Sequence, residues 1–308
     1  MLLNKPVRLQ QILQLNDILK SELKNDVMNQ YNLMLTESES IKYDHRTSEL
    51  FNERNRYQNI LANESSRYRS DNLLYINANW VEDKYILTQG PMLGYIHEFW
   101  SMVFDTKCKI IVCLANENDQ IGFDSYFDDQ FIIEYGSYSI QVAKKAVLNS
   151  YNITIRDIVI KKRHEPELFA TTMDILSEVE VTIKHIQYTA WPDDGVPVET
   201  KDVLTVLSFV DKYSDTDSPI IIHCSAGVGR TGTFVVIKDI VDRIIDFLIG
   251  ADDNNILDIN IGSIVTQFRR YRRGLVQTQC QFEFCYQAII KFIELLQSHI
   301  ANSNLEIH

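Results

Sequence analysis

The chain has 308 residues, 45% of them hydrophobic, and a formal net charge of −12. That hydrophobic content supports a large core, and no Ser/Gly/Pro-rich stretch resembles a linker, so a single domain is expected. The acidic balance argues against nucleic acid and against an anionic membrane surface as partners. The N-terminus lacks the apolar run of a signal peptide and no 18-residue apolar span occurs, so no membrane anchor is expected.

The cysteines point to a reducing environment. Their number is odd and their spacing is unpaired, which is typical of reduced thiols in a cytosol-like compartment. We therefore expect a cytoplasmic protein. The five residues are Cys108, Cys113, Cys224, Cys280 and Cys285.

The first half of the chain is predicted to form helices and then strands. Residues 6–36 carry apolar side chains at helical spacing, with a break around residues 24–26, and predict two helices. Residues 37–56 are polar and predict a loop. Residues 74–81 alternate apolar and polar, as a half-buried strand does. Further strands are expected over residues 85–89, 109–114, 131–135, 138–147 and 153–162, and a helix over residues 97–106.

The second half is dominated by helices. Residues 165–178 are ambiguous, and residues 180–188 alternate as a strand that ends in a loop over residues 189–197. Helices are expected over residues 199–213, from Gly229 or Arg230 onwards, and over residues 258–272 and 280–300, with a buried strand over residues 220–223. Strands first and long helices last predict an α/β (α+β) domain with a mixed sheet flanked by helices.

A glycine-rich turn joins the buried strand at residues 220–223 to the long helix that follows. Glycines permit backbone angles that let successive N–H groups point into one concavity, and the helix dipole adds positive charge. Arg230 adds a planar guanidinium that matches two oxygens of a phosphate. No Gly-Lys-Ser/Thr follows, so this is not a Walker-type loop. The turn predicts an anion site formed by Ser225, Ala226, Gly227, Val228 and Gly229.

Cys224 lies at the foot of this turn. Helix N-termini and nearby cations stabilise a thiolate, and a thiolate under a bound phosphoryl group is a nucleophile aimed at phosphorus. A structural cysteine after a core strand is the alternative. The pattern His-Cys, five residues, Arg-Thr, with three glycines, favours the nucleophile.

Cleavage of a phosphate ester also needs a proton donor, because the departing alkoxide or phenoxide is a poor leaving group. Asp193 is the candidate, within the loop Trp191–Pro197. The prolines of this loop stiffen it, and Gly195 provides a flexion point. A carboxyl on a loop that closes over substrate also excludes water. The alternative is an ordinary polar turn.

Together these segments resemble the catalytic domain of the phosphotyrosine-specific cysteine phosphatases, receptor and non-receptor type. The resemblance runs from about residue 27 to 295. It implies a highly twisted mixed sheet with the phosphate-binding loop between a strand and a helix. Residues 1–26 are then an N-terminal helical extension and residues 27–300 the catalytic domain. The segments that match the family's motifs are His223–Thr231, Trp191–Pro197, Asn55–Tyr57, Tyr75–Asn79, Thr88–Pro91 and Val276–Phe282.

The resemblance implies a role for each residue of the catalytic group. Cys224 takes the phosphoryl group, Arg230 binds it, and Thr231 hydrogen-bonds the departing thiolate. Asp193 first protonates the tyrosine oxygen and then deprotonates the attacking water. No metal and no cofactor are implied.

It also implies roles for residues around the pocket. Gln277 positions the attacking water, with Gln281 beside it, and an amide suits this because it donates and accepts at once. Tyr57 stacks on the substrate ring and sets the depth of the pocket, which excludes the shorter phosphoserine. A core aromatic is the alternative for Tyr57.

This sequence departs from the family pattern at several positions. Asn59 stands where an aspartate usually accepts hydrogen bonds from the substrate backbone, so peptide affinity is expected to be weaker. The basic residue expected near residues 122–124 is missing, and Glu117 is the predicted acidic partner of Arg230. Asp194 adds a second carboxylate beside the acid, which is unfavourable near a dianion unless it points outward.

Two further expectations concern the rim of the pocket. Gly274 has no side chain where the family uses bulk to gate access, so access is expected to be open. Arg269 and Arg272 match family positions near the pocket. With Arg270 and Arg273 they predict the main basic patch, or else a solvated helix end.

We therefore predict a monomeric protein-tyrosine phosphatase that acts on phosphotyrosine proteins through a cysteinyl-phosphate intermediate. A dual-specificity or lipid phosphatase is a second reading, but shallow-pocket relatives lack the recognition and glutamine loops. A third is a pseudophosphatase that binds phosphotyrosine without turnover. Intact Cys224, Asp193, Arg230 and Gln277 argue against it, whereas Asn59 and Asp194 keep it open.

Overall fold

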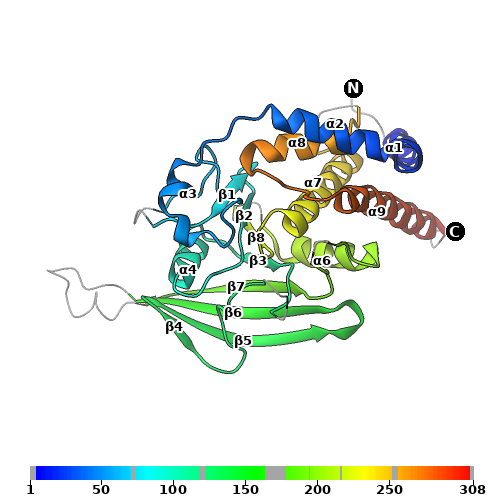
Figure 1. Ribbon diagram of the computed structural model, residues 1–308. Coiled ribbons are helices and arrows are strands. Elements are labelled where there is room, and N and C mark those ends of the chain that lie inside the picture. The colour runs from blue at the N-terminus through cyan, green and yellow to red at the C-terminus, as the bar shows by residue number, and fades with distance from the viewer. Residues whose placement is uncertain are drawn as a thin grey trace.

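One mixed β-sheet runs through the molecule (Figure 1). The computed structural model describes residues 5–70, 74–117, 119, 122–163, 178–193, 195–215, 217–251 and 256–305. Eight strands in this part of the chain lie in the order β1-β2-β8-β3-β7-β6-β5-β4. Their bounds are β1 Ala78–Val81, β2 Tyr85–Thr88, β3 Ile110–Cys113, β4 Ile133–Tyr135, β5 Tyr138–Leu148, β6 Ile153–Arg163, β7 Glu178–Tyr188 and β8 Ile220–His223.

The central strands are parallel and the outer ones antiparallel. β8 pairs in parallel with β2 and β3, and β3 pairs in parallel with β7. His223 lies opposite Thr88 and Cys113, and Cys113 lies opposite Gln187, so four strands end at one edge. Ligands in such sheets bind beyond the carboxyl ends of the strands, because the following loops gather there.

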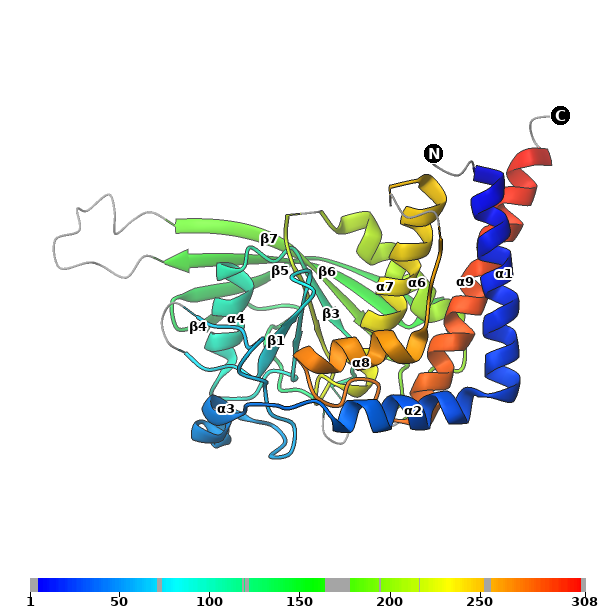
Figure 2. The same cartoon turned by 90° about the horizontal axis from the view of Figure 1, so that it is seen from above.

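Helices cover both faces of the sheet. Figure 2 shows α1, α7, α8 and α9 gathered on one side, with α4 on the other. α4 packs through Phe99 against the ring of His223. The bounds are α1 Lys5–Asn25, α2 Val27–Glu39, α3 Arg46–Leu50, α4 Ile96–Asp105, α6 Thr200–Tyr213, α7 Gly229–Ile249, α8 Ile261–Tyr271 and α9 Gln279–Leu305. Short 3₁₀ turns occupy Asn52–Arg54 and Asn149–Tyr151.

The core lies where α7 and α9 meet the central strands. All four residues of β3 and of β8 are buried, which explains the apolar β-branched residues at the first three positions of each strand. On α7, Ile237, Ile240 and Ile244 are fully buried. Removing an isoleucine side chain from water stabilises the fold by roughly 1.5–3 kcal/mol. This packing holds the first turn of α7 against the end of β8.

α1 is docked onto this core. Ile12 and Leu19 are fully buried, and α1 packs along α9 and α7. Arg8 is also buried, and its Nη1 donates to the carbonyl of Phe247 at 2.8 Å. A cation at this place satisfies an end carbonyl of α7 and opposes the negative pole of the helix.

The architecture confirms the predicted fold class: a single domain whose mixed, twisted sheet is flanked by helices. The two N-terminal helices are confirmed, with Asp26 between them. Reading residues 37–56 as a loop was wrong, because they contain α3 and a 3₁₀ turn. These are too short for an apolar period and are fixed by tertiary bonds such as Ser48 Oγ to the carbonyl of Ala62 at 2.9 Å. The ambiguous segment over residues 165–178 lies almost wholly outside the described residues.

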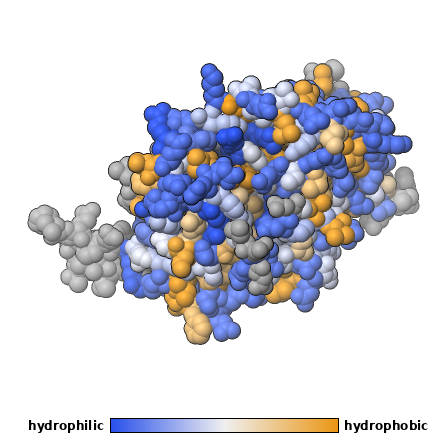
Figure 3. Space-filling view, in the orientation of Figure 1, coloured by the Kyte–Doolittle hydropathy of each residue, from blue (hydrophilic) through white to orange (hydrophobic). Residues whose placement is uncertain are grey.

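The surface in the view of Figure 3 is largely hydrophilic, with hydrophobic residues in small groups. Across the described ranges, none of the helices combines the length and apolarity needed to span a bilayer.

Candidate active site

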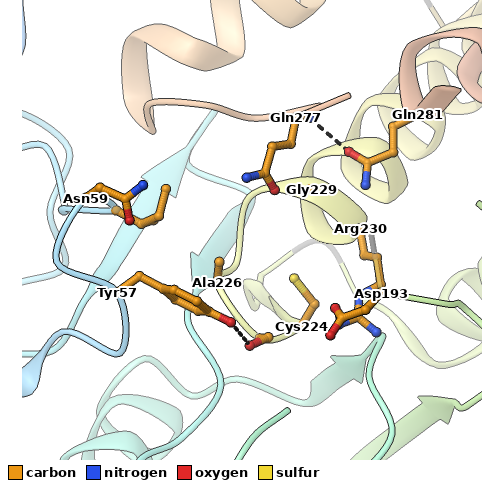
Figure 4. A pocket seen from close by; sticks show the side chains of 11 residues that line it. Tyr57, Asn59, Asp193, Cys224, Ala226, Gly229, Arg230, Gln277 and Gln281 are labelled. Carbon is orange, nitrogen blue, oxygen red and sulfur yellow. Dashed lines mark hydrogen bonds and ion pairs between the residues drawn. The ribbon is translucent and has the colours of Figure 1, made fainter. Parts of the chain in front are cut away.

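The turn between β8 and α7 forms the floor of a cavity of about 260 Å³ at the edge where the parallel strands end. Figure 4 shows the sulfur of Cys224 at the centre of this turn, with the other labelled side chains around it. The cavity collects ten of the residues expected from the sequence, and Ile60 in addition. The ten are Tyr57, Asn59, Asp193, Cys224, Ser225, Ala226, Gly229, Arg230, Gln277 and Gln281.

Arg272 braces the turn from behind. Its Nε donates to the carbonyl of Gly227 at 2.8 Å and its Nη2 to that of Ala226 at 3.0 Å. The third nitrogen, Nη1, donates to Asn79 Oδ1 at 2.8 Å. The side chain is 0% exposed, and burial lowers its pKa to about 10, so it stays charged.

The remaining carbonyls of the turn are also held by donors outside it. His223 Nδ1 lies 3.1 Å from the carbonyl of Cys224, and the backbone amide of Gly90 donates to that of Ser225 at 2.8 Å. The amide of Val276 donates to the carbonyl of Val228 at 3.2 Å. Since C=O and N–H of a trans peptide point in opposite directions, carbonyls held outward leave the amides pointing into the cavity. The turn is therefore an anion cradle before any ligand arrives.

Gly227 is required by this arrangement. Its φ is +71°, and a Cβ there would lie 2.1 Å from the carbonyl oxygen of Thr88. Its amide donates to Cys224 Sγ at 3.3 Å. A backbone donor on the sulfur stabilises the thiolate, which is the nucleophilic form.

Arg230 reaches the cavity from the first turn of α7 and lies between two carboxylates. Nη1 bonds Asp119 Oδ2 at 2.7 Å and Nη2 bonds Asp193 Oδ1 at 2.6 Å. Burial disfavours its charge, but Cys224, Asp119 and Asp193 more than compensate and raise the pKa of Arg230. The prediction of Glu117 as its partner was wrong. Glu117 is exposed, and Asp119, two residues further on in the loop after β3, occupies that position.

Asp193 is placed by the loop after β7. Trp191 is buried, and its Nε1 donates to the carbonyl of Gly195 at 3.1 Å, which closes the loop on itself. Its own carbonyl accepts from Arg230 Nη1 at 3.1 Å. These bonds hold the carboxyl of Asp193 at the mouth of the cavity (Figure 4). Asp194 lies outside the described residues.

Tyr57 forms one wall of the cavity. Its hydroxyl lies 2.7 Å from Ser225 Oγ, which ties the wall to the cradle (Figure 4). The preceding residues are anchored: Asn55 Nδ2 donates to the carbonyl of Ser48 at 2.8 Å, and Arg56 Nη2 bonds Asp124 at 2.8 Å. A fixed backbone gives the ring of Tyr57 a defined position.

Gln277 lines the side of the cavity opposite Tyr57 (Figure 4). The preceding residue, Val276, has φ +56°, an unusual value for a β-branched residue. Its carbonyl accepts from Arg269 Nη2 at 2.8 Å, which helps hold this strained conformation. The backbone amide of Gln277 donates to Gln281 Oε1 at 2.9 Å, so both glutamines form one unit at the start of α9.

Three expected residues lie behind the lining of the cavity. Gly227 and Val228 contribute the backbone described above. Thr231 is fully buried, and its Oγ1 finds no hydrogen-bond partner in the part of the chain that the structure describes. A buried hydroxyl without another partner can donate a hydrogen bond to the Cys224 sulfur when that sulfur becomes a thiolate.

The predicted basic patch was partly wrong. Arg269 and Arg272 are buried and bond backbone carbonyls, whereas Arg270 and Arg273 are exposed. Gly274 has φ +80°, and a Cβ there would meet nothing within 4 Å; open access to the cavity stays a prediction.

Sequence reasoning assigned no role to three features of the site. These are the ion pair of Asp119 with Arg230, the hydrogen bond from the amide of Gly90, and the buried hydrogen bonds of the His223 ring. Gly90 carries a signal in hindsight: a Cβ there would lie 2.7 Å from the carbonyl of Cys224, so a glycine after β2 marks a close backbone approach.

Comparison with known proteins agrees with this geometry. The family model described as "Protein-tyrosine phosphatase" matches residues 51–291. "Tyrosine-protein phosphatase 2" of Dictyostelium discoideum is 38% identical over 219 residues, which cover 70% of this chain and 54% of the relative. "Protein-tyrosine-phosphatase PTP1" of Arabidopsis thaliana is 31% identical over 259 residues, covering 79% of this chain and 71% of the relative.

Other relatives are much longer than the matched region. "Tyrosine-protein phosphatase Lar-like" of Caenorhabditis elegans is 33% identical over 280 residues, which cover 86% of this chain but 12% of the relative. The chain thus spans about half the length of the Dictyostelium protein and a small part of the nematode one.

Proposed function

Because the chain belongs to the protein-tyrosine phosphatase family, we propose that it hydrolyses phosphotyrosine in proteins through a cysteinyl-phosphate intermediate on Cys224. The observation that carries the proposal is the cradle of inward amides around the Cys224 sulfur, with Arg230 and Asp193 at its mouth. We place the catalytic domain at residues 27–300 and treat residues 1–26 as a helical extension of it.

In the first step the phosphate enters the cradle. Its oxygens accept from the backbone amides of residues 225–230 and from the guanidinium of Arg230, a planar donor that suits two oxygens. This displaces Asp193 from Arg230 and leaves its carboxylate beside the ester oxygen, where the negative charge of the phosphate favours uptake of a proton from solvent. The thiolate of Cys224 then attacks phosphorus, the P–O bond breaks, and Asp193 gives its proton to the tyrosine oxygen.

In the second step water releases the phosphate. Gln277 holds a water in line with the S–P bond, and Asp193, now a carboxylate, takes a proton from it as it attacks. The S–P bond breaks and its electron pair returns to Cys224. Thr231, whose Oγ1 is buried beside the turn, donates to the returning thiolate. Metal ions and cofactors take no part in the proposed steps.

A pair of matched peptides tests the activity. We expect phosphate release from a phosphotyrosine peptide and none from the same peptide with phosphoserine, because the cradle lies at the bottom of a cavity walled by Tyr57. Equal rates on both peptides would instead indicate a dual-specificity enzyme. Tight binding of the phosphotyrosine peptide without release would indicate a pseudophosphatase.

Replacing Tyr57 tests the proposed wall. Tyr57→Ala is expected to lower kcat/KM for a phosphotyrosine peptide by about tenfold more than for acetyl phosphate, which has no ring, since aromatic stacking contributes up to about 1.5 kcal/mol beyond burial. Tyr57→Phe is the control, because it keeps the ring and removes only the bond to Ser225. Equal losses on both substrates in Tyr57→Ala would argue against a role in recognition.

The substrates and compartment are also proposals. Phosphotyrosine proteins are the proposed partners, and a monomer suffices for a site that this one chain completes. We propose a cytoplasmic location, because all five cysteines lie in the described ranges and none is in a disulfide.

A further inference from the structure

A chain of buried hydrogen bonds runs from β7 to the carbonyl of Cys224. The hydroxyl of Tyr126 lies 2.6 Å from His185 Nε2 and 2.8 Å from His223 Nε2. The other ring nitrogen of His223, Nδ1, lies 3.1 Å from the carbonyl oxygen of Cys224. All three side chains are 0% exposed.

The three side chains are neutral. Burial lowers the pKa of His223 to about 4, and burial with the charge of Arg156 lowers the pKa of His185 well below its ordinary value. Burial raises the pKa of Tyr126 well above its ordinary value, so its hydroxyl keeps the proton. The thiol of Cys113 also lies beside the rings, and burial raises its pKa to about 12; Arg56 and Arg230 act on His223, and Glu117 acts on Tyr126. Each imidazole therefore carries one proton.

The positions of these protons follow from one fixed acceptor. A carbonyl oxygen only accepts, so the proton of His223 is on Nδ1 and its Nε2 is an acceptor. Tyr126 must then donate to His223, and its single proton is used. The remaining contact requires His185 Nε2 to donate to the Tyr126 oxygen. This leaves His185 Nδ1 bare, and it is indeed a buried atom without a hydrogen-bond partner among the described residues.

The opposite arrangement is less favourable. It would turn the lone pair of His223 Nδ1 towards the carbonyl oxygen of Cys224 at 3.1 Å and bury a donor on His185 without an acceptor. Unpaired buried polar groups destabilise more than a made bond stabilises. All bonds in the chain thus point the same way, and aligned hydrogen bonds polarise one another.

From this geometry we propose that His185 is a positioning residue for the nucleophile loop: by donating to Tyr126 it directs the Tyr126 hydroxyl to His223, which holds the Cys224 carbonyl outward. The carbonyl of Cys224 and the amide of Ser225 belong to one peptide unit, so holding the first outward aims the second into the cradle. Among the described residues, the hydrogen bond of the His185 ring is to Tyr126, so His185 acts on the turn through Tyr126 and His223. The inference rests on the proposed role of Cys224 as nucleophile.

Two variants separate positioning from mere packing. His185→Leu keeps bulk but cannot donate to Tyr126, whereas His185→Gln places an amide donor at similar reach. We expect His185→Leu to raise the pH midpoint of Cys224 alkylation by iodoacetamide by about 0.5 pH unit and to lower kcat/KM about threefold, the worth of one buried hydrogen bond. Because its amide can donate to Tyr126, His185→Gln should bring kcat/KM to within about twofold of wild type and the alkylation midpoint to within about 0.3 pH unit of it.

The control is Ile183→Ala, two residues earlier on the same face of β7, where the side chain is buried but outside the chain of hydrogen bonds. It should lower Tm without moving the alkylation midpoint. An unchanged midpoint in His185→Leu, an equal shift in His185→Gln, or an equal shift in Ile183→Ala would each overturn the proposal.

Imidazole ¹⁵N spectra of the wild-type protein test the proton positions directly. We expect the proton on Nδ1 of His223 and on Nε2 of His185, and the reverse assignment for either ring would refute the scheme. These readouts do not depend on turnover. A wild-type protein that released no phosphate from a phosphotyrosine peptide would instead contradict the proposed function itself, and with it the inference that rests on that function.

Discussion

Cys224→Ser is expected to abolish phosphate release, a loss on the order of 10⁶-fold for a covalent nucleophile, while binding of phosphotyrosine peptides persists. The cradle is made by backbone amides whose carbonyls are held by Arg272, Gly90 and His223, so it survives the substitution. A serine hydroxyl in the same place stays protonated and cannot attack phosphorus. Single-turnover assays and peptide titration by fluorescence anisotropy measure the two effects separately.

Cys280→Ser is the matched control, because the thiol of Cys280 is exposed at the start of α9, one residue before Gln281. It should leave turnover at the wild-type level. Substantial turnover in Cys224→Ser would rule out the covalent mechanism, and loss of activity in Cys280→Ser would mean that the nucleophile had been misassigned.

Asp193→Asn is expected to slow turnover of phosphotyrosine peptides by about 10²–10⁴-fold, the usual contribution of general acid–base catalysis. An asparagine keeps an oxygen that can accept from Arg230, so the loop contacts survive, but it has no acidic proton to give. The loss should shrink for p-nitrophenyl phosphate, whose leaving group is already stable as an anion. The fall in kcat as the pH rises, which reflects loss of the proton that Asp193 must give, should also disappear.

Asp194→Asn tests whether the neighbouring carboxyl shares this role. It should leave the chemistry nearly intact and improve affinity for dianionic peptides, since it removes like charge near the site. If Asp194→Asn slowed turnover and Asp193→Asn did not, the acid would have to be reassigned.

The regular elements were predictable because their physical causes are local. An apolar β-branched run such as Ile220–Ile222 after a proline predicts a buried strand, and the three-and-four spacing on α7 predicts a helix with a buried stripe. The glycines of the turn between them indicate an anion site. The paired helices at the N-terminus followed from the same spacing, interrupted at Asp26.

What the sequence did not reveal depends on contacts between distant residues. Glu117 and Asp119 are equally plausible partners for Arg230 from spacing alone, and the path of the loop after β3 decides between them. Arg269 and Arg272 look like members of a basic surface patch. Only the fold shows that both turn inward to backbone carbonyls, 45 residues away in the case of Arg272 and Gly227. The hydrogen-bond chain joins His185 of β7, Tyr126 of the segment between β3 and β4, and His223 at the end of β8, and it has no local signature in the sequence.

The outward-held carbonyls of the cradle also affect how the enzyme treats its own product. A loop that is already in place loses little conformational entropy when it closes on an oxyanion. Inorganic phosphate therefore binds the same preorganised backbone amides as the substrate, and once released it competes with the substrate for them. Two features oppose this product inhibition: the carboxylate of Asp193, which reclaims Arg230 when the phosphate departs, and the acidic body of the molecule, whose charge of −12 repels a dianion.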